Sequence, residues 1–133
     1  MRINSFKEFE QLNEEVKLSK VAKKEEFDGY TILIGRNAEM NDILTTEIAD
    51  KDDIFLHVHD FPGSHVIIKK KDNEEIPKNV IKRAAELAAQ NSRGKGRVDV
   101  VWTEIKNVTK DKKHKTGEVY VNHKNSNFMK INI

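Results

Sequence analysis

Cysteine is absent from this chain of 133 residues. A chain without thiols forms no disulfide, no thiolate zinc site and no cysteine nucleophile, and it suits a reducing compartment. No apolar run approaches the roughly 20 residues that a membrane-spanning helix needs. Residues 1–10 also lack the apolar segment of a signal peptide. We therefore expect a cytoplasmic protein without a membrane partner.

Aromatic residues are scarce, at 7% of the sequence, whereas 35% of the residues are charged. The net charge is only +2, but it is unevenly distributed. Residues 1–53 hold 8 Lys/Arg and 13 Asp/Glu, a net charge of −5, whereas residues 54–133 hold 16 and 9, a net charge of +7. This asymmetry favours contact between the C-terminal part and a nucleic acid or another acidic surface, with a well-solvated surface as the alternative.

The spacing of apolar residues predicts an α+β domain with a mixed or antiparallel β-sheet. One main helix is expected over about 77–92, where Pro77 occupies the first helical position and apolar residues form a broad stripe. A short helix is expected over about 38–48, with Asn37 as its N-cap.

Turn residues separate the expected strands. The Asp28-Gly29 pair marks a hairpin turn, and Gly35 ends the strand that follows, where a backbone without Cβ is needed. Residues 54–68 predict a second hairpin whose strands are apolar on both faces, which is typical of central strands. The expected strands are one that precedes the Asp28-Gly29 turn, then 30–34, 54–58, 64–68 and 98–103, with a final hairpin between 117–121 and 128–133.

The division along the chain follows from the same pattern. Residues 1–26 are expected to be a lead-in helix and strand, with the amphipathic helix over 5–15, and residues 27–133 to be the domain proper. No linker separates the two parts, so a single compact domain is predicted.

Polar residues are densest among apolar ones between Gly35 and His65. This polar cluster contains Arg36, Asn37, Asn41, Asp42, His57, His59, Asp60, Ser64 and His65. Three kinds of chemistry fit these residue types: a metal site, hydrolytic catalysis and a recognition surface.

A metal site would use the three histidines. His57 and His59 lie two apart on a strand and share a face, and His65 comes across the hairpin with Asp60 nearby. A His-x-His pair alone is a weak signal, so we predict no bound metal.

Hydrolysis would use Ser64 beside His65, but adjacent strand residues point to opposite faces, so the two cannot easily pair. We therefore predict no catalytic residue and no cofactor.

A recognition surface needs no metal, because Arg, Asn, Ser and His donate hydrogen bonds to phosphate and ribose oxygens. Two basic loops favour this interpretation: residues 92–97 hold three cations among glycines, and residues 106–115 hold five lysines. Only Trp102, Tyr120 and His114 are candidate stacking rings near these loops, which favours backbone or shape recognition over sequence-specific single-strand readout. The alternative for each loop is a solvated surface.

These residues resemble a known family, the NFACT-R domain. Its pattern is matched by Ile34-Gly35-Arg36-Asn37, by Asn41-Asp42 with Leu44-Thr45, and by Pro62-Gly63-Ser64-His65. The segments 84–92, 98–103 and 108–110 follow in the same order, so the resemblance covers about residues 27–121. Phe55 stands where the family usually has Trp, and Thr116 where it usually has Pro, which makes the last turn less rigid.

The resemblance implies an RNA-binding module of the ribosome quality-control tailing factors, here expected as a stand-alone protein and not an enzyme. Its partners would be tRNA or large-subunit ribosomal RNA, with the ribosome as a further candidate partner. Fibronectin binding, which older family names mention, has no support in the residues. The alternative function is a metal-dependent or RNA-modification accessory enzyme that uses His57, His59 and His65. The predicted RNA-binding residues are Arg36, Asn37, Asn41, Asp42, His57, Asp60, Ser64, His65, Arg93, Lys95, Arg97, Lys106, Lys110, Lys113 and Lys115.

Overall fold

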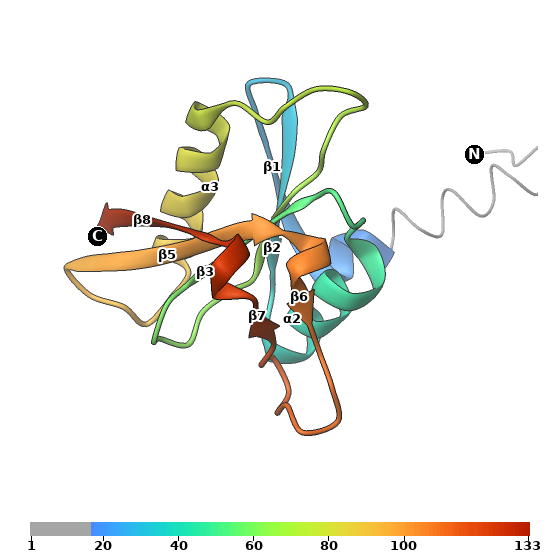
Figure 1. Cartoon of the computed structure of the whole chain (residues 1–133), viewed down its shortest axis with the longest axis vertical. Coiled ribbons are helices and arrows are strands. Elements are labelled where there is room, and N and C mark those ends of the chain that lie inside the picture. Colours follow the sequence, from blue (N-terminus) through green and yellow to red (C-terminus); the bar gives the residue numbers. More distant parts are fainter. Residues whose placement is uncertain (1–16) are drawn as a thin grey trace, which may run out of the picture.

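Six strands form one antiparallel sheet with the order β1-β2-β4-β3-β5-β8 (Figure 1). The structure, a computed structural model, describes residues 17–133, so the helix expected over 5–15 lies outside the described residues. The strands of the sheet are β1 (Ala22–Phe27), β2 (Tyr30–Gly35), β3 (Ile54–Val58), β4 (Val66–Ile68), β5 (Arg97–Glu104) and β8 (Asn127–Asn132). The predicted α+β class is confirmed, and every pairing in the sheet is antiparallel.

The helices and the remaining short elements lie between these strands. They are α2 (Ala38–Ile43), the π-helical turn η1 (Leu44–Ile48), α3 (Lys78–Gln90), the 3-10 turns η2 (Ile105–Asn107) and η3 (His123–Asn125), and a small two-stranded sheet of β6 (Val108–Thr109) and β7 (Tyr120–Val121). Residues 17–21, which precede β1, are also helical. No helix among residues 17–133 is long and apolar enough to cross a bilayer.

Two hairpins form where the sequence predicts them. Asp28 and Gly29 both have positive φ, 49° and 80°, which is the geometry of the tight turn that matches the twist of β1 and β2. Strands β3 and β4 pair as the second hairpin, with Ile54 opposite Ile68. β4 is shorter than predicted, because its registers with β2 and β3 begin at Val66.

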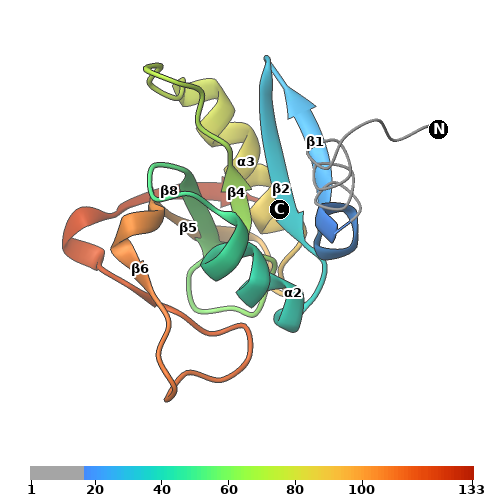
Figure 2. The ribbon, with the colours of Figure 1, turned by 90° about the vertical axis from the view of Figure 1, so that its right-hand side faces the viewer.

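The sheet is covered on both faces, as the apolar strands predicted (Figure 2). On one face α3 packs Val80, Ala84 and Ala88 against β3, β4 and β5. On the other face α2 and η1 place Leu44 against Phe55 and Ile67. Because alternate residues of a strand point to opposite faces, the neighbours Phe55 and Leu56 lie in different cores.

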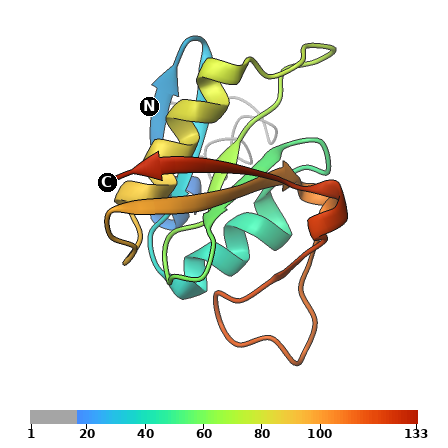
Figure 3. The ribbon, with the colours of Figure 1, turned by 60° about the vertical axis from the view of Figure 1, so that its left-hand side comes forward.

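Two expectations are corrected. Pro77 is the N-cap of α3, with an extended backbone, and is not its first helical residue. The final hairpin between 117–121 and 128–133 does not form: β7 pairs with β6, whereas β8 pairs along β5. The sheet offers β8 six partners on β5, from Arg97↔Asn132 to Trp102↔Asn127, and this long register replaces the local hairpin. Figure 3 shows β5 and β8 side by side and the loop between β6 and β7 projecting away from the sheet.

Candidate nucleic-acid interface

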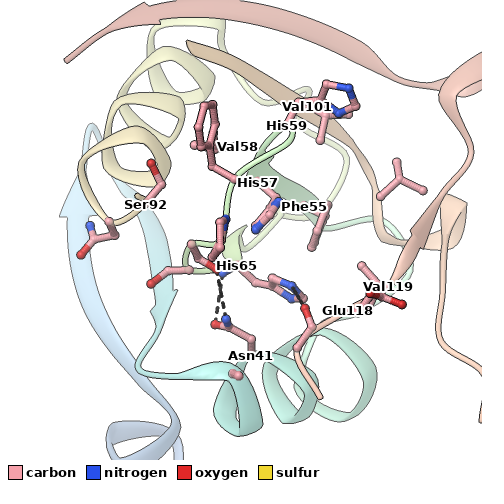
Figure 4. A pocket seen from close by; sticks show the side chains of 18 of the residues that line it. Asn41, Phe55, His57, Val58, His59, His65, Ser92, Val101, Glu118 and Val119 are labelled. Carbon is pink, nitrogen blue, oxygen red and sulfur yellow. Dashed lines mark hydrogen bonds between the residues drawn. The ribbon is translucent and has the colours of Figure 1, made fainter. Parts of the chain in front are cut away.

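A groove with a volume of about 1100 Å³ opens on the α2 side of the sheet, beyond the part that α2 and η1 cover (Figure 4). Phe55, His57 and Val101 of β3 and β5 line it, next to residues 60–64 that follow β3. Residues 115–121 line it from the other direction. Residues 91–93 after α3 and the start of α2 complete the lining, so the groove joins five parts of the chain that are far apart in the sequence.

The turn after β3 is held tightly against the C-terminal end of α3. Gly63 and Ser92 form an isolated β-bridge, and a Cβ on Gly63 would lie 2.8 Å from the Ser92 Cβ. The amide of Ser64 donates to the carbonyl of Asn91 (2.9 Å), and the amide of Arg93 donates to the carbonyl of Pro62 (2.9 Å). This packing fixes the exposed Arg93 at the rim of the groove.

The opposite wall is anchored to α2 by one lysine. The ammonium group of Lys110 donates to the carbonyls of Lys115 and Glu118 and lies 3.2 Å from the carboxylate of Asp42. The same carboxylate accepts a hydrogen bond from the amide of Gly117 (3.0 Å). Lys110 and Asp42 therefore hold the loop between β6 and β7 in place, and their charged groups have partners within the protein.

His65 is the centre of a buried polar network and is only 1% exposed. Its Nδ1 lies 2.7 Å from the Thr45 hydroxyl, and its Nε2 lies 3.0 Å from the carbonyl oxygen of Gly117. A carbonyl only accepts, so Nε2 carries the proton and Nδ1 accepts from Thr45. Burial lowers the pKa of His65 to about 4, with the neighbouring His57 acting in the same direction. The ring is therefore neutral at pH 7.

Asn41 completes this network from α2. Its Oδ1 accepts from the amide of His65 (3.1 Å) and its Nδ2 donates to the carbonyl of Gly63 (3.3 Å), as Figure 4 shows. Asn41 reaches this position only because Gly35 lacks a side chain, since a Cβ there would lie 1.8 Å from Oδ1. The predicted need for glycine at position 35 is thus confirmed, and its cause is Asn41.

The three histidines of the metal hypothesis do not converge. His57 faces His65, with ring centroids 5.4 Å apart, but both nitrogens of His65 are already hydrogen-bonded. His59 instead contacts His123 and Phe128. Burial also lowers the pKa of His57. Across residues 17–133, no three His, Cys, Asp or Glu side chains are grouped so that they could share a metal ion.

Hydrolytic chemistry at Ser64 has no geometric support either. The His65 nitrogens are engaged by Thr45 and Gly117, so they are not available to activate the neighbouring hydroxyl. Ser64 is held through its own amide by Asn91.

The predicted site residues divide into two groups. Those that line the groove are Arg36, Asn37, Asn41, His57, Asp60, Ser64, His65, Arg93 and Lys115. Those outside its lining are Asp42, Lys95, Arg97, Lys106, Lys110 and Lys113. In the second group, Lys106 lies on η2 beside Glu104 (3.2 Å), and Lys95 and Arg97 are exposed where β5 begins.

Sequence reasoning missed the aromatic side chains of this region. Phe61 and His123 line the groove together with the expected Tyr120, and Phe128 adjoins it through His59 and His123. The sequence gives no sign that these rings lie together, because they follow no helical or strand spacing along the chain. Of the rings that were expected, Trp102 packs against the core under α3, on the other face of the sheet.

The groove lies within a region that matches a known protein family. The sequence model of the NFACT protein RNA binding domain matches residues 20–123, which include the groove residues from Arg36 to His123. The chain belongs to this family. The match begins before β1, so it extends beyond the segment 27–121 on which the resemblance was first noted.

Similar proteins carry names from ribosome quality control. The chain is 42% identical over 97 residues to the Rqc2 homolog RqcH of Bacillus subtilis, covering 71% of this chain and 16% of that protein. It is 34% identical over 88 residues to ribosome quality control complex subunit 2 of Schizosaccharomyces pombe, covering 62% of this chain and 8% of that protein. The chain thus spans less than a fifth of the length of these relatives.

A solved structure shares the fold. The C-terminal part of the fibronectin/fibrinogen-binding protein of Streptococcus suis superimposes with a TM-score of 0.73 at 33% identity, covering 84% of this chain and 44% of that chain. The chain therefore shares its family with proteins named for ribosome quality control, and its fold with part of that streptococcal protein.

Proposed function

We propose that this domain binds RNA in the groove, with phosphate contacts from Arg36, Arg93 and Lys115. The observation that carries the proposal is the convergence of these three exposed cations, which come from three separate segments, around one groove of about 1100 Å³. Arginine and lysine side chains are the usual donors to phosphate oxygens in protein–RNA contacts.

The groove also offers groups that suit ribose and bases. Asn37 and Ser64 line it, and so do the carboxylates of Asp60 and Glu118. Carboxylates repel phosphate but accept hydrogen bonds from base amino groups and from the ribose 2′-hydroxyl. The mixture supports a site with separate places for phosphate and for the rest of the nucleotide.

The remaining predicted residues have a different part in the proposal. Asn41, Asp42, His65 and Lys110 hold the groove in shape through bonds within the protein and do not contact RNA, whereas His57 lines the groove and faces the ligand. Lys95, Arg97 and Lys113 contact phosphates of an RNA that is long enough to extend beyond the groove. Lys106 contacts the same RNA at the edge of this surface. The module acts without catalysis, and its RNA is tRNA or large-subunit ribosomal RNA, in keeping with the ribosome quality-control names of its relatives.

A salt titration of RNA binding tests the proposal. Affinity for labelled tRNA and for a large-subunit ribosomal RNA fragment is measured by fluorescence anisotropy, for the wild type and for the triple variant Arg36→Gln, Arg93→Gln, Lys115→Gln. Loss of three phosphate contacts should flatten the slope of log K against log salt by about 2, at about 0.7 per phosphate.

A charge-matched control carries Lys24→Gln, Lys78→Gln and Lys82→Gln, which remove three exposed cations outside the groove lining. Its slope should equal that of the wild type. Because Arg36 Nε donates to the carbonyl of Ser19 (2.9 Å), thermal unfolding of each variant is recorded first. Equal slopes for the groove variant and the wild type would contradict the assignment of phosphate contacts to these residues.

A further inference from the structure

Three rings from two distant parts of the chain meet beside the groove, where His59 and His123 line it. His59 follows β3, His123 lies on η3 and Phe128 lies on β8. Their ring centroids are 5.5 to 5.7 Å apart in all three pairs, and each pair is edge-to-face, with interplanar angles between 73° and 84°. We call His59, His123 and Phe128 the ring cluster.

The ring cluster is exposed for a structural reason. Phe128 pairs with Val101, which in turn pairs with His57, so the side chains of all three lie on the α2 side of the sheet. The helices on that side reach only as far as the core around Phe55 and Leu44, and Phe128 remains 47% exposed. Its neighbours Met129 and Ile131 turn to the other face, under α3.

Exposed aromatic residues are concentrated in this one place. Among residues 17–133, the exposed large hydrophobic side chains are Phe61, Tyr120, Phe128 and Ile133. The three aromatic ones all belong to the groove: Phe61 and Tyr120 line it, and Phe128 adjoins it through the ring cluster. Exposed apolar groups gathered in this way mark binding surfaces, whereas single scattered ones do not.

The charge around these rings selects the kind of ligand. Arg36, Arg93 and Lys115 line the same groove, so a ligand must combine flat apolar rings with negative charge. An unpaired nucleotide has both: its base stacks on an aromatic ring and its phosphate accepts from a cation. Bases inside a duplex are stacked on each other and present only their edges, so a duplex leaves exposed rings unused.

We propose that the groove is a site for single-stranded RNA, in which unpaired bases stack on Phe128 and Tyr120 while Arg93 and Lys115 hold the adjoining phosphates. This inference rests on the proposed function and makes it more specific. It replaces the expectation of backbone or shape recognition, which followed from counting rings near the two basic loops along the sequence. The fold instead brings His59, Phe61, His123 and Phe128 to the groove, beside the expected Tyr120.

The test compares two RNAs and two matched variants. Anisotropy measures binding of a 12-nucleotide unstructured RNA and of a blunt 12-base-pair duplex to the full chain. Phe128→Leu removes a ring of the cluster but keeps an apolar strand residue, and Tyr120→Leu is the second variant, at a side chain that is 58% exposed. The control, Phe27→Leu, removes a ring that packs against the core under α3.

Phe128→Leu and Tyr120→Leu should each weaken single-strand binding by about tenfold, the effect of losing one stacked base, without changing the salt slope. The control should bind as the wild type does. A 2-aminopurine placed in the single strand should be quenched by the wild type and less so by Phe128→Leu.

Two results would overturn the inference and leave RNA binding intact: tighter binding of the duplex than of the single strand, or equal losses for both RNAs in the ring variants. Unchanged single-strand affinity in both correctly folded ring variants would also overturn it. Absence of binding to either RNA at low salt would overturn the proposed function as well.

Discussion

The two faces of the sheet differ in how completely they are covered. Under α3, the core runs across the sheet from Ile32 on β2 to Ile131 on β8. On the other face, α2 and η1 cover a smaller core around Phe55 and Leu44, and the ends of β3, β5 and β8 form the groove. The first face provides most of the buried apolar surface that stabilises the fold, whereas the second leaves space and polar groups for a ligand.

The boundary between covered and open surface is a polar network and not an apolar contact. Asn41, Thr45, Asp53, His65 and Thr103 are the buried polar residues of the described chain, and Asn41, Thr45 and His65 are joined at this boundary. A buried hydrogen-bonded network fixes relative positions more strictly than apolar packing does, because its bonds are directional. The groove is therefore held in shape by a network whose polar groups are hydrogen-bonded to one another and to the backbone.

The largest expected effect is on the covered face. Leu56→Ala removes a fully buried side chain under α3 and should lower the free energy of unfolding by about 3 kcal/mol. Urea unfolding followed by far-UV circular dichroism measures the loss. Binding of RNA, measured well below the unfolding midpoint, should be retained. A loss below about 1 kcal/mol would mean that this core tolerates cavities and does not dominate stability.

At the boundary, stability should depend on pH through His65. Its pKa is about 4 in the folded protein and about 6.5 in the unfolded chain, so the unfolded chain binds the additional proton between these values. The stabilising contribution is therefore fully present above pH 6.5 and is lost as the pH falls toward 4. Between pH 8 and pH 5 the loss should be about 2 kcal/mol.

The measurement is urea unfolding at both pH values for the wild type and for His65→Gln, which does not titrate. The difference between the two proteins isolates His65 from other groups, including His57, whose pKa is also lowered. An identical pH dependence in the two proteins would contradict the buried neutral state of His65.

A smaller and more local effect is expected at the loop between β6 and β7. Lys110→Met removes the ammonium group that holds Lys115, Glu118 and Asp42 together. Because the bonds that it loses hold one loop, the global loss should be about 1 kcal/mol. Hydrogen exchange should accelerate in residues 111–117 and stay unchanged in α3. Lys106→Met, which breaks the surface pair with Glu104, is the control and should leave that loop unaffected.

The smallest effect on stability is expected on the open face. Phe128→Leu exchanges a side chain that is already 47% exposed and should change the free energy of unfolding by no more than about 0.5 kcal/mol. Thermal unfolding of this variant, beside Leu56→Ala, gives the sharpest contrast between the faces. A large loss at Phe128 would show that the ring cluster contributes to the core.

Much of the fold was predictable because its signals are local. The Asp28-Gly29 turn, the Asn37 N-cap and the apolar stripe of α3 act over a few residues, and each is found where the sequence places it. The partner of β8 was not predictable in this way. Residues 117–121 and 128–133 have the pattern of a local hairpin, but each pairs with a strand that precedes both of them. β7 pairs with β6, and β8 pairs with β5, which offers it six partners.

The candidate site was also predictable only in part. Its polar residues were recognisable as a cluster and as a family pattern, but their roles were not, because burial and exposure depend on what covers each side chain. His65 and Arg93 were predicted together as RNA contacts, and only the fold buries the first and exposes the second.

By itself the sequence determined the α+β class, the doubly covered central strands, the positions of the helices and the membership in the NFACT RNA-binding family. These follow from periodicity, turn residues and motif order, which are properties of neighbouring residues. Only the tertiary structure decided that Lys110 holds a loop and that His59, His123 and Phe128 form one cluster. The physical reason is that contacts between residues far apart in the chain depend on strand order, and no local pattern encodes that order.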